Sequence, residues 1–157
     1  MPILNLKEID RRILLQLQTN ARLSNVDLSQ RVNLSQSPCL RRVRKLEERG
    51  IIKEYVTLID QNAVGLPVSV FVSVSLEKQI EPALELFEKT IQSRPEVMEC
   101  YLMTGDADYL LRVVTRDLAA YERFLLDHLT RIEGVSSIKS SFALKQVTYK
   151  TVLPIQL

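Results

Sequence analysis

The hydrophobic pattern of this chain changes its period at Gly50, and this change limits the folds that the chain can adopt. Before Gly50, apolar residues recur every three to four positions, which is the spacing of amphipathic helices. After it, β-rich runs with alternating apolar residues are separated by further helical stretches. The sequence therefore predicts an α+β protein, with a helical domain over residues 1–50, a strand and linker over 51–67, and a second domain over 68–157.

Three helices are predicted in the first domain, over residues 5–20, 24–32 and 35–50, with Asn5 and Ser24 as the N-caps of the first two. We expect Ser35 to cap the third helix through its hydroxyl and Gly50 to close it in a left-handed conformation. Three residues at helical spacing are expected to face the core: Leu40, Val43 and Leu46. Cys39 also projects toward this apolar side and is expected to be a small core residue. Because only a three-residue break separates the last two helices, the pattern predicts a helix-turn-helix.

The third helix also carries a basic face, opposite its apolar side. Arg41 lies almost opposite the apolar residues, so we predict that it reads a base edge in the DNA major groove while the other cations hold phosphates. Net charge supports a polyanionic partner, since residues 1–60 hold 11 Lys/Arg against 7 Asp/Glu and residues 61–157 hold 10 against 12. The alternative is a solvated charge face. The candidate DNA-binding residues are Ser35, Gln36, Ser37, Arg41, Arg42, Arg44 and Lys45.

The second domain has the predicted order βαββαβ, which is that of a ferredoxin-like sandwich. We predict strands over 68–76, 97–103, 109–115 and 135–147, helices over 81–93 and 117–132, and a short strand or tail over 148–157. Asp117 is expected to cap the second of these helices. Right-handed crossovers place both helices on one face of the sheet. The other face carries Phe71 among serines, and we infer that a second subunit covers it. The alternative is a solvated face, which antiparallel sheets tolerate.

Several classes of protein are disfavoured by the composition. Cys39 and Cys100 fit neither a disulfide framework nor a zinc site, and His128 is the only histidine. The sequence has no phosphate-binding glycine loop or catalytic cluster, so we expect no enzyme activity, cofactor or metal. It also shows no signal peptide and no apolar run near the roughly 20 residues of a membrane span, which predicts a cytoplasmic protein without a membrane partner.

Four stretches of the chain resemble the Lrp/AsnC, or feast/famine, family of transcriptional regulators: IDRRILLQLQTNAR, SNVDLSQRVNLSQSPCLRRVRKLEERGII, TGDADYLLRV and GVSSIKSSFAL. The front match is closest to the leucine-responsive branch. The resemblance implies a winged or plain helix-turn-helix followed by a ligand-responsive domain. It also implies an amino-acid effector, and homodimers that pair through their sheets and assemble further, commonly to octamers.

The resemblance places the effector between subunits, near a Gly-Asp-x-Asp turn that is formed here by residues 105–108. Residues of the last long strand approach the turn from another subunit. Relatives often carry threonine where this chain has Ile138. An aspartate of the turn can pair with the effector's ammonium, and backbone N–H groups can hold its carboxylate. Without the resemblance, an ordinary hairpin turn is the favoured interpretation of these residues. The candidate effector-binding residues are Met103, Thr104, Gly105, Asp106, Ala107, Asp108, Tyr109, Ile138 and Ser140.

The function that these patterns favour is a sequence-selective DNA-binding regulator that responds to a small amino acid. Leucine and methionine are the first candidates, because the turn holds no lysine or arginine that could neutralise an acidic side chain. One alternative is a nucleoid-type architectural protein with little sequence preference, which the same basic helix would serve. The other is an enzyme, since ferredoxin-like folds host many activities.

Overall fold

The computed structural model describes residues 6–156, which form two compact units. The helical unit comprises the chain up to Leu58 together with Val147 onward, and the sheet unit comprises residues 59–146. Their charges differ in sign. The helical unit holds 12 Lys/Arg against 6 Asp/Glu, and the sheet unit holds 9 against 13. The final residues were expected to belong with the second domain, but they group with the helices instead.

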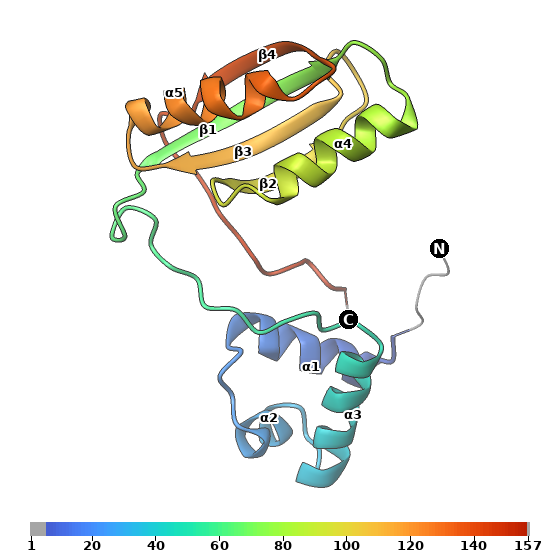
Figure 1. Cartoon of the computed structure of the whole chain (residues 1–157). Helices are drawn as coiled ribbons and strands as arrows, with labels where there is room; N and C mark the ends of the chain where they lie inside the picture. The colour runs from blue at the N-terminus through green and yellow to red at the C-terminus, as the bar shows by residue number, and fades with distance from the viewer. Residues whose placement is uncertain (1–5, 157) are drawn as a thin grey trace. The chain divides into compact units, whose positions relative to one another are not determined.

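The helical unit contains the three expected helices, α1 (Glu8–Thr19), α2 (Asn25–Arg31) and α3 (Gln36–Glu48), drawn in blue to teal in Figure 1. They enclose one small core of buried side chains: Ile13, Leu14, Leu28, Val32, Cys39 and Leu46. Because burial of apolar surface is the main force that holds such short helices in place, this core fixes how α3 is presented. Asn5, the expected cap of the first helix, lies outside the described residues.

Local chemistry explains the ends of α2 and α3. The Ser24 hydroxyl accepts the Asp27 N–H at 3.1 Å, as the predicted cap of α2 requires. Asn33 turns the chain between the two helices at φ 55°, a left-handed conformation that asparagine tolerates. Gly50 follows α3 at φ 66° and closes it as predicted. Ser35 occupies the N-cap position of α3, but its hydroxyl makes no capping bond.

Two expectations for this unit were wrong. Leu40 does not face the core, because 38% of it is exposed and Cys39 fills the buried position in its place. The expected strand over residues 51–59 does not form, since this stretch has no strand within the described chain to pair with. It runs as an irregular connection with exposed apolar side chains, among them Val56 and Leu58.

The sheet unit has the predicted ferredoxin-like order. Its strands are β1 (Val68–Leu76), β2 (Val97–Leu102), β3 (Tyr109–Thr115) and β4 (Val135–Phe142), and its helices are α4 (Glu81–Gln92), α5 (Leu118–Asp127) and the 3-10 turn η1 (Leu129–Arg131). The strands form one antiparallel sheet in the order β2-β3-β1-β4. The last helix and the last strand end earlier than the sequence predicted. Asp117 caps α5 by accepting the Ala120 N–H at 2.6 Å.

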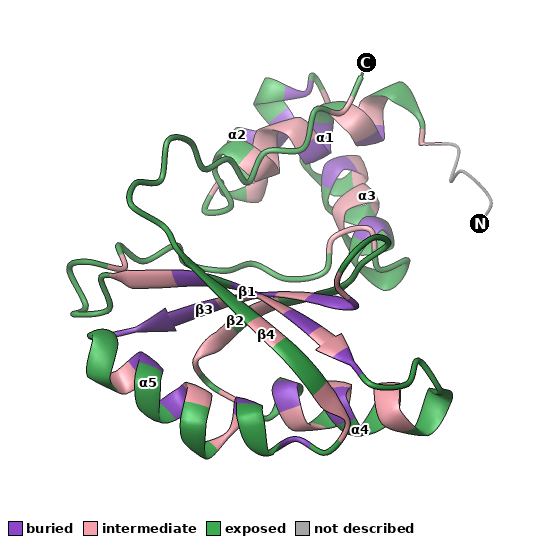
Figure 2. Cartoon of the chain, turned by 90° about the horizontal axis from the view of Figure 1, so that it is seen from above, coloured by how far each residue is buried: buried purple, intermediate pink, exposed green. Residues whose placement is uncertain are grey.

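Both helices cover the same face of the sheet, as Figures 1 and 2 show. The valines of β1 point into this layer, where they meet Phe87 of α4 and Tyr121 and Phe124 of α5. Phe71, on the same strand, points to the other face and is 40% exposed. No helix among residues 6–156 combines the length and the apolar character that a membrane crossing requires.

Candidate nucleic-acid interface and ligand-binding turn

The outer face of α3 is a row of unpaired polar and basic side chains. Arg41, Arg44 and Lys45 are exposed, and none of the ion pairs among the described residues involves them. Gln36 and Ser37 are exposed in the first turn of the same helix. A helix of this kind can present its N-terminal residues to base edges and its basic flanks to phosphates.

Arg42 does something different from its neighbours on α3. Its Nη1 donates to Asp10 Oδ1 of α1 at 2.8 Å, and both side chains are largely shielded from water, with 32% and 13% exposed. A guanidinium held in this way braces α3 against α1. The sequence predicted Arg42 as a phosphate contact, whereas the structure engages it in the packing of the unit.

The start of α3 is held from α2 as well. The side-chain amide of Asn25 donates to the Gln36 carbonyl oxygen at 2.9 Å, across the turn that contains Asn33. The Leu34 N–H also donates to the Ser29 carbonyl oxygen at 2.9 Å. The N-terminal turn of α3 is therefore held through contacts to its backbone. The side chains of Gln36 and Ser37 take no part in these contacts and are exposed.

The turn between β2 and β3 is the second candidate site. The Met103 N–H donates to the Asp108 carbonyl oxygen at 2.8 Å and closes the turn. Gly105 sits at φ 130°, a conformation that favours glycine, and its surroundings are open. Thr104 and Asp106 are exposed, so the Asp106 carboxylate is available to a ligand.

The side chain of Asp108 is buried inside the turn and does not face solvent. The residue is only 8% exposed, and its carboxylate accepts the Leu76 N–H and the Gln79 side-chain amide, each at 2.6 Å. Its own N–H donates to the Val74 carbonyl oxygen at 2.9 Å. Asp108 thereby fastens the turn to the end of β1 and to the loop that precedes α4. Of the two aspartates considered for the effector's ammonium, only Asp106 is exposed.

Three other residues predicted for the effector site point toward the helix layer. Tyr109 is 1% exposed, its ring lies 4.4 Å from that of Phe87, and burial together with a hydrogen bond to Glu88 raises the pKa of its hydroxyl. The Ser140 hydroxyl hydrogen-bonds the Tyr121 hydroxyl, and Ile138 packs against the core. Ile138 and Ser140 lie on β4, which is an edge strand, and Ser140 remains exposed there.

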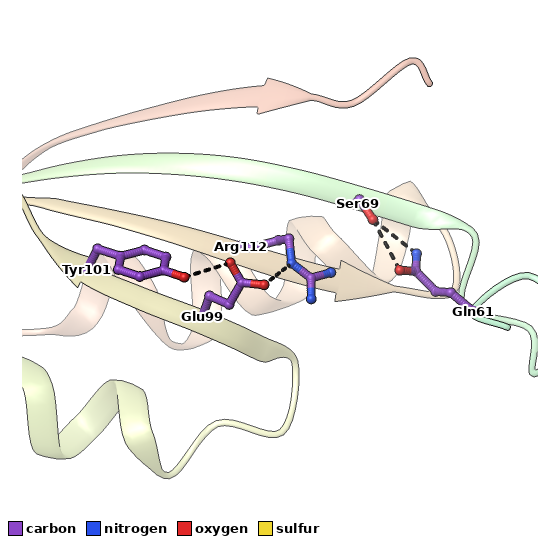
Figure 3. A network of polar contacts seen from close by, with 5 residues as sticks. All are labelled: Gln61, Ser69, Glu99, Tyr101 and Arg112. Atoms are coloured by element: carbon purple, nitrogen blue, oxygen red, sulfur yellow. Dashed lines mark hydrogen bonds and ion pairs between the residues drawn. The ribbon is translucent and has the colours of Figure 1, made fainter. Parts of the chain in front are cut away.

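The open face of the sheet combines apolar and charged residues. Phe71 pairs in register with Arg112 of β3, and Arg112 pairs with Glu99 of β2. Arg112 Nε donates to Glu99 at 2.9 Å, and the Tyr101 hydroxyl donates to the same carboxylate at 3.2 Å (Figure 3). Farther along this face, Ser69 hydrogen-bonds the Gln61 side chain, also drawn in Figure 3. Arg112 and Glu99 thus neutralise each other within the chain, whereas Lys139 of β4, in register with Ser73 on the same face, makes no ion pair with another described residue.

Comparisons with known proteins agree with the division into a DNA-binding and a ligand-binding domain. Residues 6–53 match a model of winged helix-turn-helix DNA-binding domains, and residues 69–153 match the model of the Lrp/AsnC ligand binding domain. The Bkd operon transcriptional regulator of Pseudomonas aeruginosa is 52% identical over 150 residues, which cover 96% of this chain and 98% of that protein. The chain belongs to the Lrp/AsnC family of transcriptional regulators.

Other members of the Lrp/AsnC family support this assignment over the same length. The leucine-responsive regulatory protein of Escherichia coli strain K12 is 38% identical over 152 residues, covering 97% of this chain and 93% of that protein. A transcriptional regulator of Neisseria meningitidis, crystallised as a complex with L-Met, superposes with a TM-score of 0.90 at 42% identity, covering 95% of this chain and 96% of the other. The chain is therefore a DNA-binding regulator with a ligand-binding domain, and its relatives are named as regulators rather than enzymes.

Sequence reasoning missed the residues that position both sites of this Lrp/AsnC regulator. Asp10 and Gln79 act through contacts with residues that lie 32 and 29 positions away. Asp10 could have been suspected, because a carboxylate on the apolar side of a helix needs a partner. Gln79 carries no such signal, because a polar residue in a loop is ordinary.

Proposed function

We propose that this Lrp/AsnC regulator binds a specific DNA site through α3 and changes that binding when a zwitterionic amino acid with an apolar side chain occupies the turn at residues 103–108. The observation that carries the proposal is the pair of exposed, preorganised surfaces, one on each unit. The helical unit is strongly basic, and α3 is fixed at its N-terminal turn. The ligand-binding turn displays one free carboxylate on a fastened backbone. Such a regulator works where the chromosome lies, in the cytoplasm.

In the proposed DNA complex, Arg41 reads a base edge, with Ser35, Gln36 and Ser37 at the same edge of the groove. Arg44 and Lys45 hold phosphates. All of these side chains are exposed, which supports the assignment. Arg42 contributes by holding α3 on α1, so its role differs from that of Arg44 although the two arginines lie only two positions apart.

In the proposed effector complex, Asp106 pairs with the ammonium and N–H groups around Gly105 hold the carboxylate. Asp108 and Tyr109 shape the turn from within. Met103, which is 44% exposed, offers an apolar contact for the side chain, and Ala107 leaves room beside it. Thr104 lies at the polar end. Ile138 and Ser140 approach from a second subunit, which is compatible with the edge position of β4. Methionine and leucine are favoured; the L-Met complex and the name of the leucine-responsive protein support this choice.

The proposed assembly is a homodimer formed through the open sheet face, which pairs further into larger rings such as octamers. Phe71 and Tyr101 are large aromatic residues left 40% and 53% exposed on that face. Arg112 and Glu99, which lie beside them, already form an ion pair, so a subunit that covers this face buries few unpaired charges. A dimer would also present two copies of α3 to two half-sites.

Selection of genomic fragments by the purified protein, followed by titration of the best site, tests the DNA part. A specific site should bind about 10³-fold or more tightly than random DNA at physiological salt. A ratio near one would instead indicate an architectural protein.

A thermal-shift screen of the twenty amino acids, followed by calorimetry on the ones that respond, tests the effector part. A ligand that binds only the folded state raises apparent stability, and methionine or leucine should raise it most. Preferential binding of glutamate or lysine would contradict the proposed pocket, because the turn offers no countercharge for an acidic side chain.

A further inference from the structure

The C-terminal tail contacts α1 through polar groups of its backbone. Gln18 engages both polar groups of Leu153: the Leu153 N–H donates to Gln18 Oε1 at 2.6 Å, and Gln18 Nε2 donates to the Leu153 carbonyl oxygen at 3.3 Å. The Ile155 N–H donates to the same carbonyl oxygen at 2.8 Å, which tightens the chain around Pro154. Arg11 Nη1 donates to the Gln156 carbonyl oxygen at 3.3 Å.

These contacts follow α1 over two turns. Gln18 and Arg11 are seven positions apart, so they lie on one side of the helix, about 10 Å apart along its axis. Leu153 contacts Gln18, near the C-terminal end of α1, and Gln156 contacts Arg11, nearer its N-terminal end. The tail therefore runs antiparallel to α1. Ile155 adds an apolar anchor, because its half-buried side chain packs against the core of the helical unit. The trace ends beside α1 in both Figure 1 and Figure 2.

The chain is thus connected twice between its two units, once after Leu58 and once before Val147. The second connection starts at the end of β4, and residues 143–152 lead from it to the anchored Leu153. In the proposed function, β4 carries Ile138 and Ser140, which approach the effector. At the other end, α1 holds α3 through the Asp10–Arg42 ion pair.

We propose that the tail is a strap that transmits effector binding to the DNA-reading helix. The strap comprises residues 153–156, which bind to α1. The position of β4 determines whether these residues stay bound to α1 or dissociate from it. This inference rests on the proposed function, since it needs an effector at β4. The effector must bind with different affinity when the strap is docked and when it is released, because only such a difference can shift the equilibrium.

Two substitutions in the full-length protein weaken the strap at independent points. Gln18→Leu keeps the size of the side chain but removes both hydrogen bonds to Leu153, and Ile155→Ala removes the apolar anchor. The matched controls are Thr19→Ala on the same helix and Val152→Ala on the same tail. Val152 is 45% exposed and belongs to neither hydrophobic core. Hydrogen exchange of the peptide that contains residues 150–157 verifies that the tail is released in the two strap variants and docked in the controls.

The decisive measurement is DNA affinity with and without L-methionine and L-leucine, together with calorimetric binding of the same amino acids. We expect wild type and controls to change DNA affinity on the order of 5-fold or more. The strap variants should bind the amino acid and the DNA but lose most of that change. A strap variant with a released tail and a full response would overturn the strap alone. A wild type that responds to neither amino acid would overturn the proposed effector response and the strap with it. If Gln18→Leu fails to fold, Gln18→Ala, which also removes both hydrogen bonds to Leu153, replaces it.

Discussion

At the scale of single residues, Arg42 and Arg44 of α3 differ in what they contact. Arg42 is paired with the largely buried Asp10, so Arg42→Ala leaves a carboxylate without its partner. We expect this change to lower the free energy of unfolding of the helical unit by about 1–3 kcal/mol. Urea unfolding followed by hydrogen exchange in α1 measures it. Arg44→Ala is the control, because an exposed side chain without an ion pair should change stability by less than about 0.5 kcal/mol. Equal effects of the two changes would contradict the bracing role.

Arg41→Ala should show the opposite behaviour. Arg41 is exposed and makes no ion pair among the described residues, so stability should be unchanged. Affinity for the selected DNA site should fall by about 1–3 kcal/mol, with a smaller loss on random DNA, because a base contact carries sequence information. Lys45→Ala provides the comparison, since loss of a phosphate contact should weaken all sequences alike and reduce the salt dependence. An unchanged specificity ratio in Arg41→Ala would remove that residue from base reading.

At the scale of elements, the turn that we propose as the effector site holds one buried, hydrogen-bonded aspartate, Asp108, and one exposed aspartate, Asp106. Asp108→Ala removes the acceptor for the Leu76 N–H and the Gln79 amide, so it should lower thermal stability and raise exchange across residues 103–108. Asp106→Ala should leave both unchanged and weaken calorimetric binding of methionine or leucine. The two variants serve as each other's control. Unchanged effector binding in Asp106→Ala would show that another group holds the ammonium.

The predictability of these elements follows the range of the interactions that form them. The βαββαβ order, the caps at Ser24 and Asp117, and the closure at Gly50 depend on nearby residues, and the sequence predicted them. The sequence placed Cys39 in the core correctly, but the exposure of Leu40 depends on how three helices share one small core, which a helical repeat alone does not decide. Whether residues 51–59 form a strand depends on a partner strand, which no local pattern supplies.

The candidate sites were predicted unevenly for the same reason. The basic helix and the Gly-Asp turn are contiguous in sequence, so they could be located directly. The groups that hold them come from elsewhere in the chain, as Asp10, Gln79 and the tail illustrate. Spacing along one segment contains no information about such contacts.

At the scale of the whole molecule, the grouping of the tail with the helices increases the difference in net charge between the two units. One unit carries the excess of positive charge and the other the excess of negative charge, although the chain as a whole is nearly neutral at +2. A polyanion is therefore attracted to one unit and repelled by the other, which orients the regulator on DNA before any specific contact forms.

The last prediction concerns the assembly and tests the open face of the sheet. The helices cover only one face, so Phe71 and Tyr101 remain exposed to solvent in a single chain, and pairing of two such faces buries them. Phe71→Lys places a cation at the centre of that interface, opposite the paired Arg112. We expect this change to reduce the mass measured by light scattering at micromolar concentration to that of a monomer, 18.0 kDa. Leu118→Lys makes the same kind of change at a position on α5 that is 63% exposed, and it should leave the assembly intact. Because the proposed dimer would read two half-sites, the Phe71→Lys monomer should also bind the selected site more weakly than wild type. An assembled Phe71→Lys protein would show that the subunits associate through another surface.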